Sequence, residues 1–192
     1  MKIRESGMPD VGYWESLFDI AEVLDRMELV QGVGRVVEFG CGYGSFSIPL
    51  ARRLQSADDA LLTFDIDADM VRITRDRARR EDLEKITIEQ SSRSGQELVA
   101  PRSVDYVMLF NILHGERPAE LLDLAFGWLR PGGRVGVIHW RYDPETPRGP
   151  SMAVRPRPEE LLHQMEAAGF RISAESPLDL PPYHYGILGY KP

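Results

Sequence analysis

Residues 36–44 read V-V-E-F-G-C-G-Y-G, with three glycines at alternate positions behind a glutamate. Glycine has no Cβ, so Gly40, Gly42 and Gly44 allow a tight turn and the close approach of a ligand to the backbone. A helix that follows such a turn points its free N–H groups and positive dipole end at the same ligand. The spacing therefore favours the binding of a nucleotide-like ligand, and a plain strand-to-helix turn is the alternative.

The dinucleotide fingerprint G-x-G-x-x-G is not met, because the sixth position counted from Gly40 is Ser45. Asp65 ends the next apolar run, in T-F-D-I-D, where a ribose-binding carboxylate is expected. A carboxylate that accepts from both ribose hydroxyls also rejects a 2′-phosphate, which disfavours NADP. The alternative for Asp65 is a helix N-cap, a role that Asp67 or Asp69 can fill instead.

Two histidines are candidates for proton transfer. His114 follows one apolar run, in F-N-I-L-H-G, and His139 ends another, in V-I-H-W-R-Y. An imidazole, with an ordinary pKa of about 6.5, suits a general base near neutral pH. The alternative for His114 is a hydrogen bond to the start of the following helix.

A long segment rich in proline and arginine, residues 141–158, follows the second histidine. Loops of this length are often functional, and guanidinium groups bind carboxylates and phosphates. We therefore expect a pocket for a small, anionic substrate, lined by Trp140, Arg141, Arg148 and Arg155. Ordinary surface charge is the alternative for the arginines, and the edge of the core is the alternative for Trp140.

The elements that must position these residues alternate between strands and helices. We expect helices over 12–28, 45–54, 68–80, 118–129 and 159–168, and strands over 35–39, 61–64, 86–88, 104–110, 134–139, 170–174 and 185–190. The turn R-P-G-G should separate helix 118–129 from strand 134–139. This order predicts an α/β fold with a doubly wound, mostly parallel sheet and a C-terminal antiparallel edge hairpin. Ligands of such sheets lie beyond the carboxyl ends of the strands, where the glycine turn is expected.

Composition limits the other possibilities. The 192 residues suit one domain, with an N-terminal arm and helix (1–33), a cofactor-binding core (34–140) and a substrate-side segment (141–192). A formal charge of -7 argues against a nucleic-acid or anionic-membrane surface, and the basic run 72–80 is expected on a solvated helix face. Cys41 is the one cysteine, so we expect no disulfide and no metal site. No apolar run reaches the roughly 20 residues of a membrane span, and we expect a cytoplasmic protein.

Four segments in order resemble the motifs of class I S-adenosylmethionine-dependent methyltransferases. They are V-V-E-F-G-C-G-Y-G-S-F-S, F-D-I-D-A-D-M, V-D-Y-V-M-L-F-N-I-L-H and L-R-P-G-G-R-V-G-V-I, which together span residues 36–138. The combination is specific, although each piece alone is not. The resemblance implies a small, single-domain member with a Rossmann-like fold. It also implies S-adenosyl-L-methionine as cofactor and methyl transfer to a small molecule, yielding S-adenosylhomocysteine.

The resemblance also implies a set of cofactor-binding residues. Asp65 would accept from the ribose hydroxyls, Ile66 and Met70 would flank adenine, and Asn111 would face the amino-acid end. Ser94 stands where the family usually places an acid for the adenine amine, so a weaker adenine contact is expected. The full set is Glu38, Gly40, Cys41, Gly42, Gly44, Asp65, Ile66, Met70, Ser94, Gly95 and Asn111.

Two other functions stay open at this point. One is an NAD-dependent oxidoreductase on the same architecture, and the other is a protein that binds S-adenosylmethionine without catalysis. The segment N-I-L-H stands where amino-methylating enzymes carry N-P-P-Y, which disfavours nucleic-acid bases as acceptors. Oxygen, nitrogen, sulfur and metalloid acceptors all remain compatible with the sequence, and the oligomeric state is open.

Overall fold

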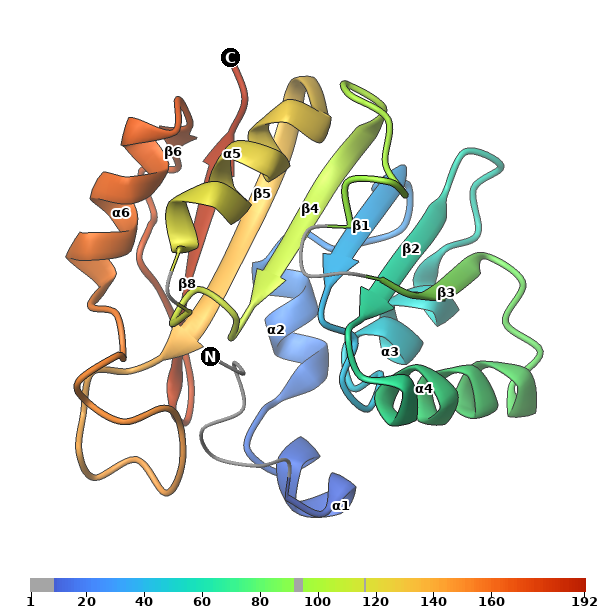
Figure 1. Ribbon diagram of the computed structural model, residues 1–192, viewed down its shortest axis with the longest axis horizontal. Helices are drawn as coiled ribbons and strands as arrows, with labels where there is room; N and C mark the ends of the chain where they lie inside the picture. Colours follow the sequence, from blue (N-terminus) through green and yellow to red (C-terminus); the bar gives the residue numbers. More distant parts are fainter. Residues whose placement is uncertain (1–8, 92–94, 116) are drawn as a thin grey trace.

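A computed structural model describes residues 9–91, 95–115 and 117–192 (Figure 1). Its strands are β1 (Arg35–Phe39), β2 (Ala60–Asp65), β3 (Ile86–Gln90), β4 (Val104–Phe110), β5 (Leu129–Trp140), β6 (Arg171–Ile172), β7 (Leu178–Leu180) and β8 (His184–Tyr190). Its helices are α1 (Val11–Glu15), α2 (Ile20–Arg26), α3 (Ser47–Arg53), α4 (Ala68–Arg80), α5 (Pro118–Trp128) and α6 (Pro158–Ala167).

The strands form one sheet of eight, in the order β3-β2-β1-β4-β5-β8-β6, with β7 also paired to β8. Strands β1 to β5 pair in parallel, and β8 runs antiparallel to β5, β6 and β7. The predicted α/β fold, with a mostly parallel sheet and antiparallel C-terminal strands, is confirmed. Strand order reverses between β1 and β4, so the turn after β1 lies at the switch point where such sheets bind ligands.

Both faces of the sheet are covered, as the apolar strand sequences require. On β4, Val107 and Leu109 pack with residues of α5 and α6, whereas Tyr106 and Met108 pack with residues of α2 and α3. Figure 1 shows α5 and α6 on one face and α2 on the other. Successive strand residues face opposite sides, so a strand buried on both faces reads as a continuous apolar run.

The predicted helix over residues 12–28 is wrong, because two caps divide it. The Asp10 carboxylate accepts from the backbone N–H groups at the start of α1, and the Asp19 carboxylate accepts from Glu22 N–H at the start of α2. Between the helices, Phe18 leaves helical geometry and forms an isolated β-bridge with Pro182. Each aspartate side chain accepts from backbone N–H groups that, in a continuous helix, would donate to the carbonyl four residues earlier.

The predicted turn at R-P-G-G is also wrong, since residues 130–133 extend β5. Gly132 N–H donates to the Lys191 carbonyl at 2.9 Å, and Lys191 N–H donates to the Gly133 carbonyl at 2.8 Å. This pairing with the chain end, far away in sequence, holds the segment as a strand. Strand β7 was likewise not predicted. It is the L-D-L part of P-L-D-L-P-P, flanked by prolines, and it pairs with β8.

In the portion of the chain that the structure covers, none of the helices has both the length and the apolar character that crossing a bilayer requires.

Candidate functional site

The glycine turn joins β1 to α3 and depends on left-handed backbone. Gly40, Gly42 and Gly44 have φ of +74°, +50° and +74°, a region that side chains disfavour. A Cβ on Gly44 would lie 2.8 Å from Thr74 Cγ2, so the turn also packs against α4. Gly40 N–H donates to the Phe64 carbonyl at 2.8 Å, which fixes the turn to the end of β2.

The Asp65 carboxylate, at the end of β2, is directed at this turn. One of its oxygens accepts from Gly42 N–H at 3.0 Å and the other accepts from Asp67 N–H at 2.9 Å. Thr74 Oγ1 donates to the Gly42 carbonyl at 3.0 Å, so both backbone groups of Gly42 are held. Asp67 is the N-cap of α4, which leaves Asp65 for the turn.

Glu38 stabilises the elements on either side of the turn. It is buried on β1, and its Oε2 accepts from the hydroxyls of Ser47, on α3, and Thr63, on β2, the latter at 2.7 Å. Burial raises the pKa of Glu38 to about 7, although both hydroxyl hydrogen bonds act to lower it; the nearby Asp65 charge raises it further. The carboxyl group thus ties three elements together at the base of the candidate site.

The remaining cofactor-binding candidates differ in exposure. Cys41 is buried, and burial, with the Glu38 and Asp65 charges, raises the pKa of its thiol well above the ordinary value. Ile66 is 47% exposed and Met70 is buried. Gly95 has φ of +57° and its backbone lies against the Phe64 ring. Ser94 lies outside the described residues.

Asn111, at the end of β4, combines backbone strain with an unsatisfied side chain. Its φ is +58°, and its N–H donates to the Ile138 carbonyl at 2.8 Å. Its buried Oδ1 and Nδ2 both lack a hydrogen-bond partner within residues 9–91, 95–115 and 117–192. The next residue, Ile112, would contact a Cβ on Gly40 at 3.4 Å, so this strand end lies beside the glycine turn. Strain and an unsatisfied buried amide together are typical of a ligand-binding position.

His114 and His139 lie side by side, one in the loop after β4 and one on β5. His139 Nε2 is 3.4 Å from His114 Nδ1, and the rings meet edge to face. His139 is fully buried, and burial, followed by the His114 and His184 charges, lowers its pKa well below the ordinary value, while the Trp140 backbone acts in the opposite direction. A neutral His139 therefore supports the ring of a partly exposed His114.

The 141–157 loop is organised around Arg155. Its buried guanidinium donates six hydrogen bonds to five acceptors. The acceptors are the carbonyls of Arg141, Asp143, Arg148 and Pro150, the last of which accepts twice, and Thr146 Oγ1. Burial lowers its pKa. These contacts fit a role in shaping the loop better than direct contact with a substrate.

The other substrate candidates are arranged differently. Trp140 is 2% exposed and packs against the rings of Trp14 and His184. Arg141 forms an ion pair with Asp179, on β7. His184 is also buried, and burial lowers its pKa to about 3. Neither of its ring nitrogens has a hydrogen-bond partner in the described part of the chain.

Sequence reasoning missed a polar contact between α1 and the glycine turn. Arg77 Nη1 donates to the Glu15 carboxylate and to the Tyr43 carbonyl, both at 2.7 Å, and Ser45 Oγ donates to Glu15 at 3.0 Å. Arg77 belongs to the basic run that was assigned to a solvated face. Thr74, a polar residue within the apolar stripe of α4, could have indicated from the sequence that this face of the helix packs against polar groups.

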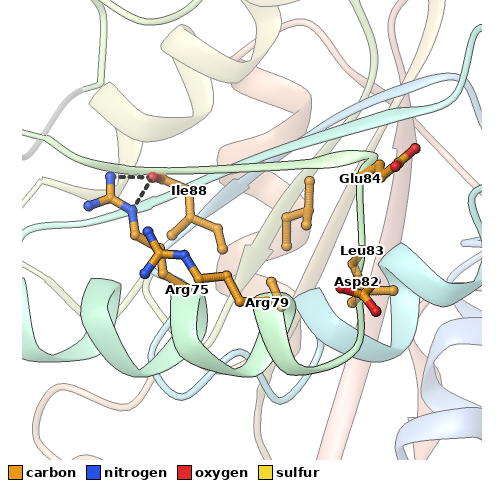
Figure 2. A pocket seen from close by; sticks show the side chains of 8 residues that line it. Arg75, Arg79, Asp82, Leu83, Glu84 and Ile88 are labelled. Carbon is orange, nitrogen blue, oxygen red and sulfur yellow. Dashed lines mark hydrogen bonds between the residues drawn. The ribbon is translucent and has the colours of Figure 1, made fainter.

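A separate surface hollow of about 410 Å³ lies between the second half of α4 and the start of β3 (Figure 2). Arg75 Nε donates there to the Ile88 carbonyl at 2.9 Å, as Figure 2 shows. The hollow includes none of the candidate residues and lies away from the carboxyl ends of the strands. Among the described residues, no group of three or more His, Cys, Asp or Glu side chains is placed to hold a metal ion.

Comparisons with solved structures give the same fold. A SAM-dependent methyltransferase from Aquifex aeolicus superposes with a TM-score of 0.80 at 20% identity, covering 94% of this chain and 93% of that one. A putative type 11 methyltransferase from Sulfolobus solfataricus gives 0.70 at 20% identity, over 91% and 93%. The 4+2 cyclase SpnF gives 0.71 at 19% identity, over 90% and 79%, so the fold alone does not determine the reaction.

A search of curated proteins gave no match, but a comparison with protein-family models did. The family model for a methyltransferase domain matches residues 36–133, half of the chain, from the start of the glycine-turn strand into β5. The match includes the glycine turn, Asp65, Asn111 and His114, which the structure places at one edge of the sheet. The chain therefore belongs to the methyltransferase domain family.

Proposed function

We propose that the chain binds S-adenosylmethionine beside the glycine turn and transfers its methyl group to a small-molecule acceptor, yielding S-adenosylhomocysteine. The observation that carries the proposal is Asn111, whose strained backbone and buried amide, without a partner among the described residues, lie beside Gly40. Leaving a buried polar group unsatisfied costs about 1–3 kcal/mol, which a ligand with matching polar groups would recover. The amino-acid end of the cofactor has such groups.

The residues around the turn fit the rest of that ligand. The Asp65 carboxylate already accepts from the glycine turn with one oxygen and from Asp67 N–H with the other, and ribose hydroxyls would replace or join these backbone donors. The exposed Ile66 side chain, next along the chain, offers an apolar surface for adenine. Gly42 has no side chain, so a ligand can approach the backbone of the turn at that position. Glu38 is buried beneath the turn, so it would support the ligand-binding backbone without contacting the ligand.

The reaction needs little more than alignment and proton removal. When bound, S-adenosylmethionine supplies a methyl group that is already activated on a sulfonium. His114 lies at the same strand ends and would take the proton that an oxygen or nitrogen acceptor loses. His139, buried and neutral, would hold the His114 ring rather than act on the acceptor. The buried aromatic rings that pack with Trp140 would keep water away from the neighbouring end of β5.

The substrate side is proposed to favour a small anion. Arg141 and Arg148 belong to the loop that follows β5, and the Arg155 guanidinium fixes the backbone carbonyls of both. Arg155 would thus set where the two other cations lie, without contacting the substrate itself. We also propose that residues 1–192 act as one domain, with this loop as the substrate-side wall.

Calorimetric titration tests the proposal. The protein would be titrated with S-adenosylmethionine, S-adenosylhomocysteine and NAD, as wild type, Asp65→Ala and Asp69→Ala. Asp69 is a matched control, since its exposed carboxylate lies four residues further along, in the first turn of α4, and forms a surface ion pair with Arg72 at 3.6 Å. We expect both sulfur ligands to bind wild type and Asp69→Ala, and to bind Asp65→Ala roughly tenfold or more weakly. Binding of NAD alone, or of no ligand, would contradict the proposal.

A further inference from the structure

We infer that Arg75 keeps the outer edge of the sheet from pairing with a second copy of the chain. The edge is strand β3, and the pairing that Arg75 prevents is antiparallel and two-fold symmetric about Ile88. This inference does not depend on the proposed function, and it is tested without ligand.

Strand β3 lies at the end of the sheet. Within the described residues it pairs with β2 alone, and Figure 1 shows it at the margin of the sheet beside α4. Leu61 N–H, on β2, donates to the carbonyl of Lys85, just before β3. Backbone groups of successive strand residues point alternately toward and away from the partner strand, so every second residue after Lys85 faces outward. The outward-facing residues are Ile86, Ile88 and Gln90.

Arg75 reaches this edge from α4. Its Nε and Nη2 donate to the Ile88 carbonyl at 2.9 and 2.5 Å, as Figure 2 shows, and Nη2 lies 3.3 Å from the Glu89 carboxylate. The Ile88 side chain packs with residues of α4, whereas the next side chain, Glu89, faces the other side of the sheet. The guanidinium therefore crosses the edge from one face to the other. An added strand would lie about 4.7–4.9 Å from β3, in the space that this guanidinium occupies.

The sequence of β3, I-T-I-E-Q, is otherwise suited to pairing with itself. It contains three β-branched residues and no proline. In an antiparallel pair centred on Ile88, the two copies of Ile88 exchange both N–H···O bonds, and Ile86 pairs with Gln90. Thr87 then lies opposite Glu89, so like charges meet only diagonally. The carbonyl that Arg75 covers is the central acceptor of this register.

Helix packing does not close the edge by itself. The hollow of about 410 Å³ separates the second half of α4 from the start of β3. Arg79, one turn after Arg75, also lines the hollow, but its guanidinium forms a surface ion pair with Asp76 at 3.9 Å. Exposed strand edges associate readily, and a charged side chain placed across the edge is a common way to prevent it. Arg75 supplies this barrier at the centre of β3.

Sedimentation velocity of the full chain over a wide range of protein concentration tests the inference. The Arg75 side chain is 40% exposed, so Arg75→Ala leaves the core intact. We expect its mass to rise with concentration to about twice that of wild type, because a two-fold contact closes after one copy is added. Arg79→Ala removes the same charge from the same hollow and should keep the wild-type mass.

Three results would overturn the inference. One is an unchanged mass for folded Arg75→Ala at every concentration. Another is equal association of Arg79→Ala, which would make loss of charge the cause. The third is growth beyond a doubled mass, since a contact that does not close cannot be the two-fold register about Ile88.

A proline at the edge places the contact on β3. Gln90 N–H faces outward, so Gln90→Pro leaves the pairing with β2 in place but removes a donor that the self-paired strand needs. Arg75→Ala combined with Gln90→Pro should therefore return to the wild-type mass. Association that persisted in this double variant would show that another surface is responsible.

Hydrogen exchange gives a second readout at the level of single residues. In Arg75→Ala, the Ile88 and Gln90 amides should exchange more slowly at high protein concentration than at low concentration, because the second copy then accepts from them. In wild type, exchange of the same amides should not depend on concentration. Concentration-independent exchange of both amides in an associating Arg75→Ala would contradict pairing through β3.

Discussion

Arg77, on α4, lies 2.7 Å from the Glu15 carboxylate of α1, and the same nitrogen donates to the Tyr43 carbonyl within the glycine turn. Tyr43 in turn donates its hydroxyl to the Pro9 carbonyl at 2.7 Å, just before α1. Figure 1 shows α1 beyond the strand ends, on the side to which the β1 and β2 arrowheads point. The N-terminal helix is therefore attached to the loop that we propose binds the cofactor.

Loosening this attachment should weaken ligand binding. In Glu15→Gln the charge partner of Arg77 is lost, and the turn carbonyl is held by a less constrained guanidinium. Because both side chains are about three-quarters buried, we expect a loss of about 1 kcal/mol, or roughly a fivefold higher Kd for S-adenosylhomocysteine by calorimetry. Glu22→Gln removes a similar ion pair, with Arg26 on the surface of α2, and should leave the Kd unchanged. Equal effects of the two substitutions would exclude a specific role for Glu15.

The steric limit at Gly44 gives a second prediction. Gly44→Ala places a Cβ in left-handed backbone and 2.8 Å from Thr74 Cγ2. We expect the free energy of unfolding to fall by about 1–3 kcal/mol, measured by urea denaturation, together with weaker ligand binding. Thr74→Ser removes the methyl group but keeps the hydroxyl that bonds Gly42. Part of the loss should therefore be recovered in the double variant, and purely additive losses would show that the methyl contact is not responsible.

Stability should depend on pH through Glu38. Its folded-state pKa of about 7 lies above the ordinary value of 4.5, so the folded protein holds this proton more tightly than the unfolded chain does. The stabilisation is complete below about pH 4.5 and is lost as pH rises through 7, by roughly 3 kcal/mol in all. Glu38→Gln should remove this part of the slope when urea unfolding is followed from pH 4.5 to 8. A variant with the wild-type slope would place the titration on another group.

The sequence predicted best the elements whose signals are local. Helix α4 was predicted with its observed ends, because the Asp67 cap directly before it and the apolar stripe along it are both local signals. Strand β4 was predicted with its observed ends as well, since burial on two faces leaves a continuous apolar run. The R-P-G-G segment was not, because its pairing with Lys191 depends on a residue far along the chain.

The site followed the same division. Parallel strands bring their carboxyl ends to one edge, so the meeting of the glycine turn with Asp65 and of His114 with His139 was accessible from the element order. The unsatisfied amide of Asn111 and the contact between Glu15 and Arg77 were not, because they depend on side-chain geometry that leaves no spacing in the sequence.

Arg155 gives the last prediction, which separates a shaping role from substrate binding. A lysine at this position has one donor group and cannot reach acceptors on five residues, so Arg155→Lys should leave buried carbonyls of the 141–157 loop unsatisfied. Removing several buried hydrogen bonds should lower the free energy of unfolding by about 2–4 kcal/mol and speed proteolysis within the loop.

Arg157→Lys is the matched control in the same loop. Arg157 is exposed and lies over the Tyr142 ring at 3.7 Å, a contact that lysine can replace. The protease should cleave this variant at the same rate as wild type. If Arg155→Lys also kept wild-type stability and cleavage, the loop would not depend on the Arg155 hydrogen bonds, and direct contact between this guanidinium and an anionic substrate would become the better explanation.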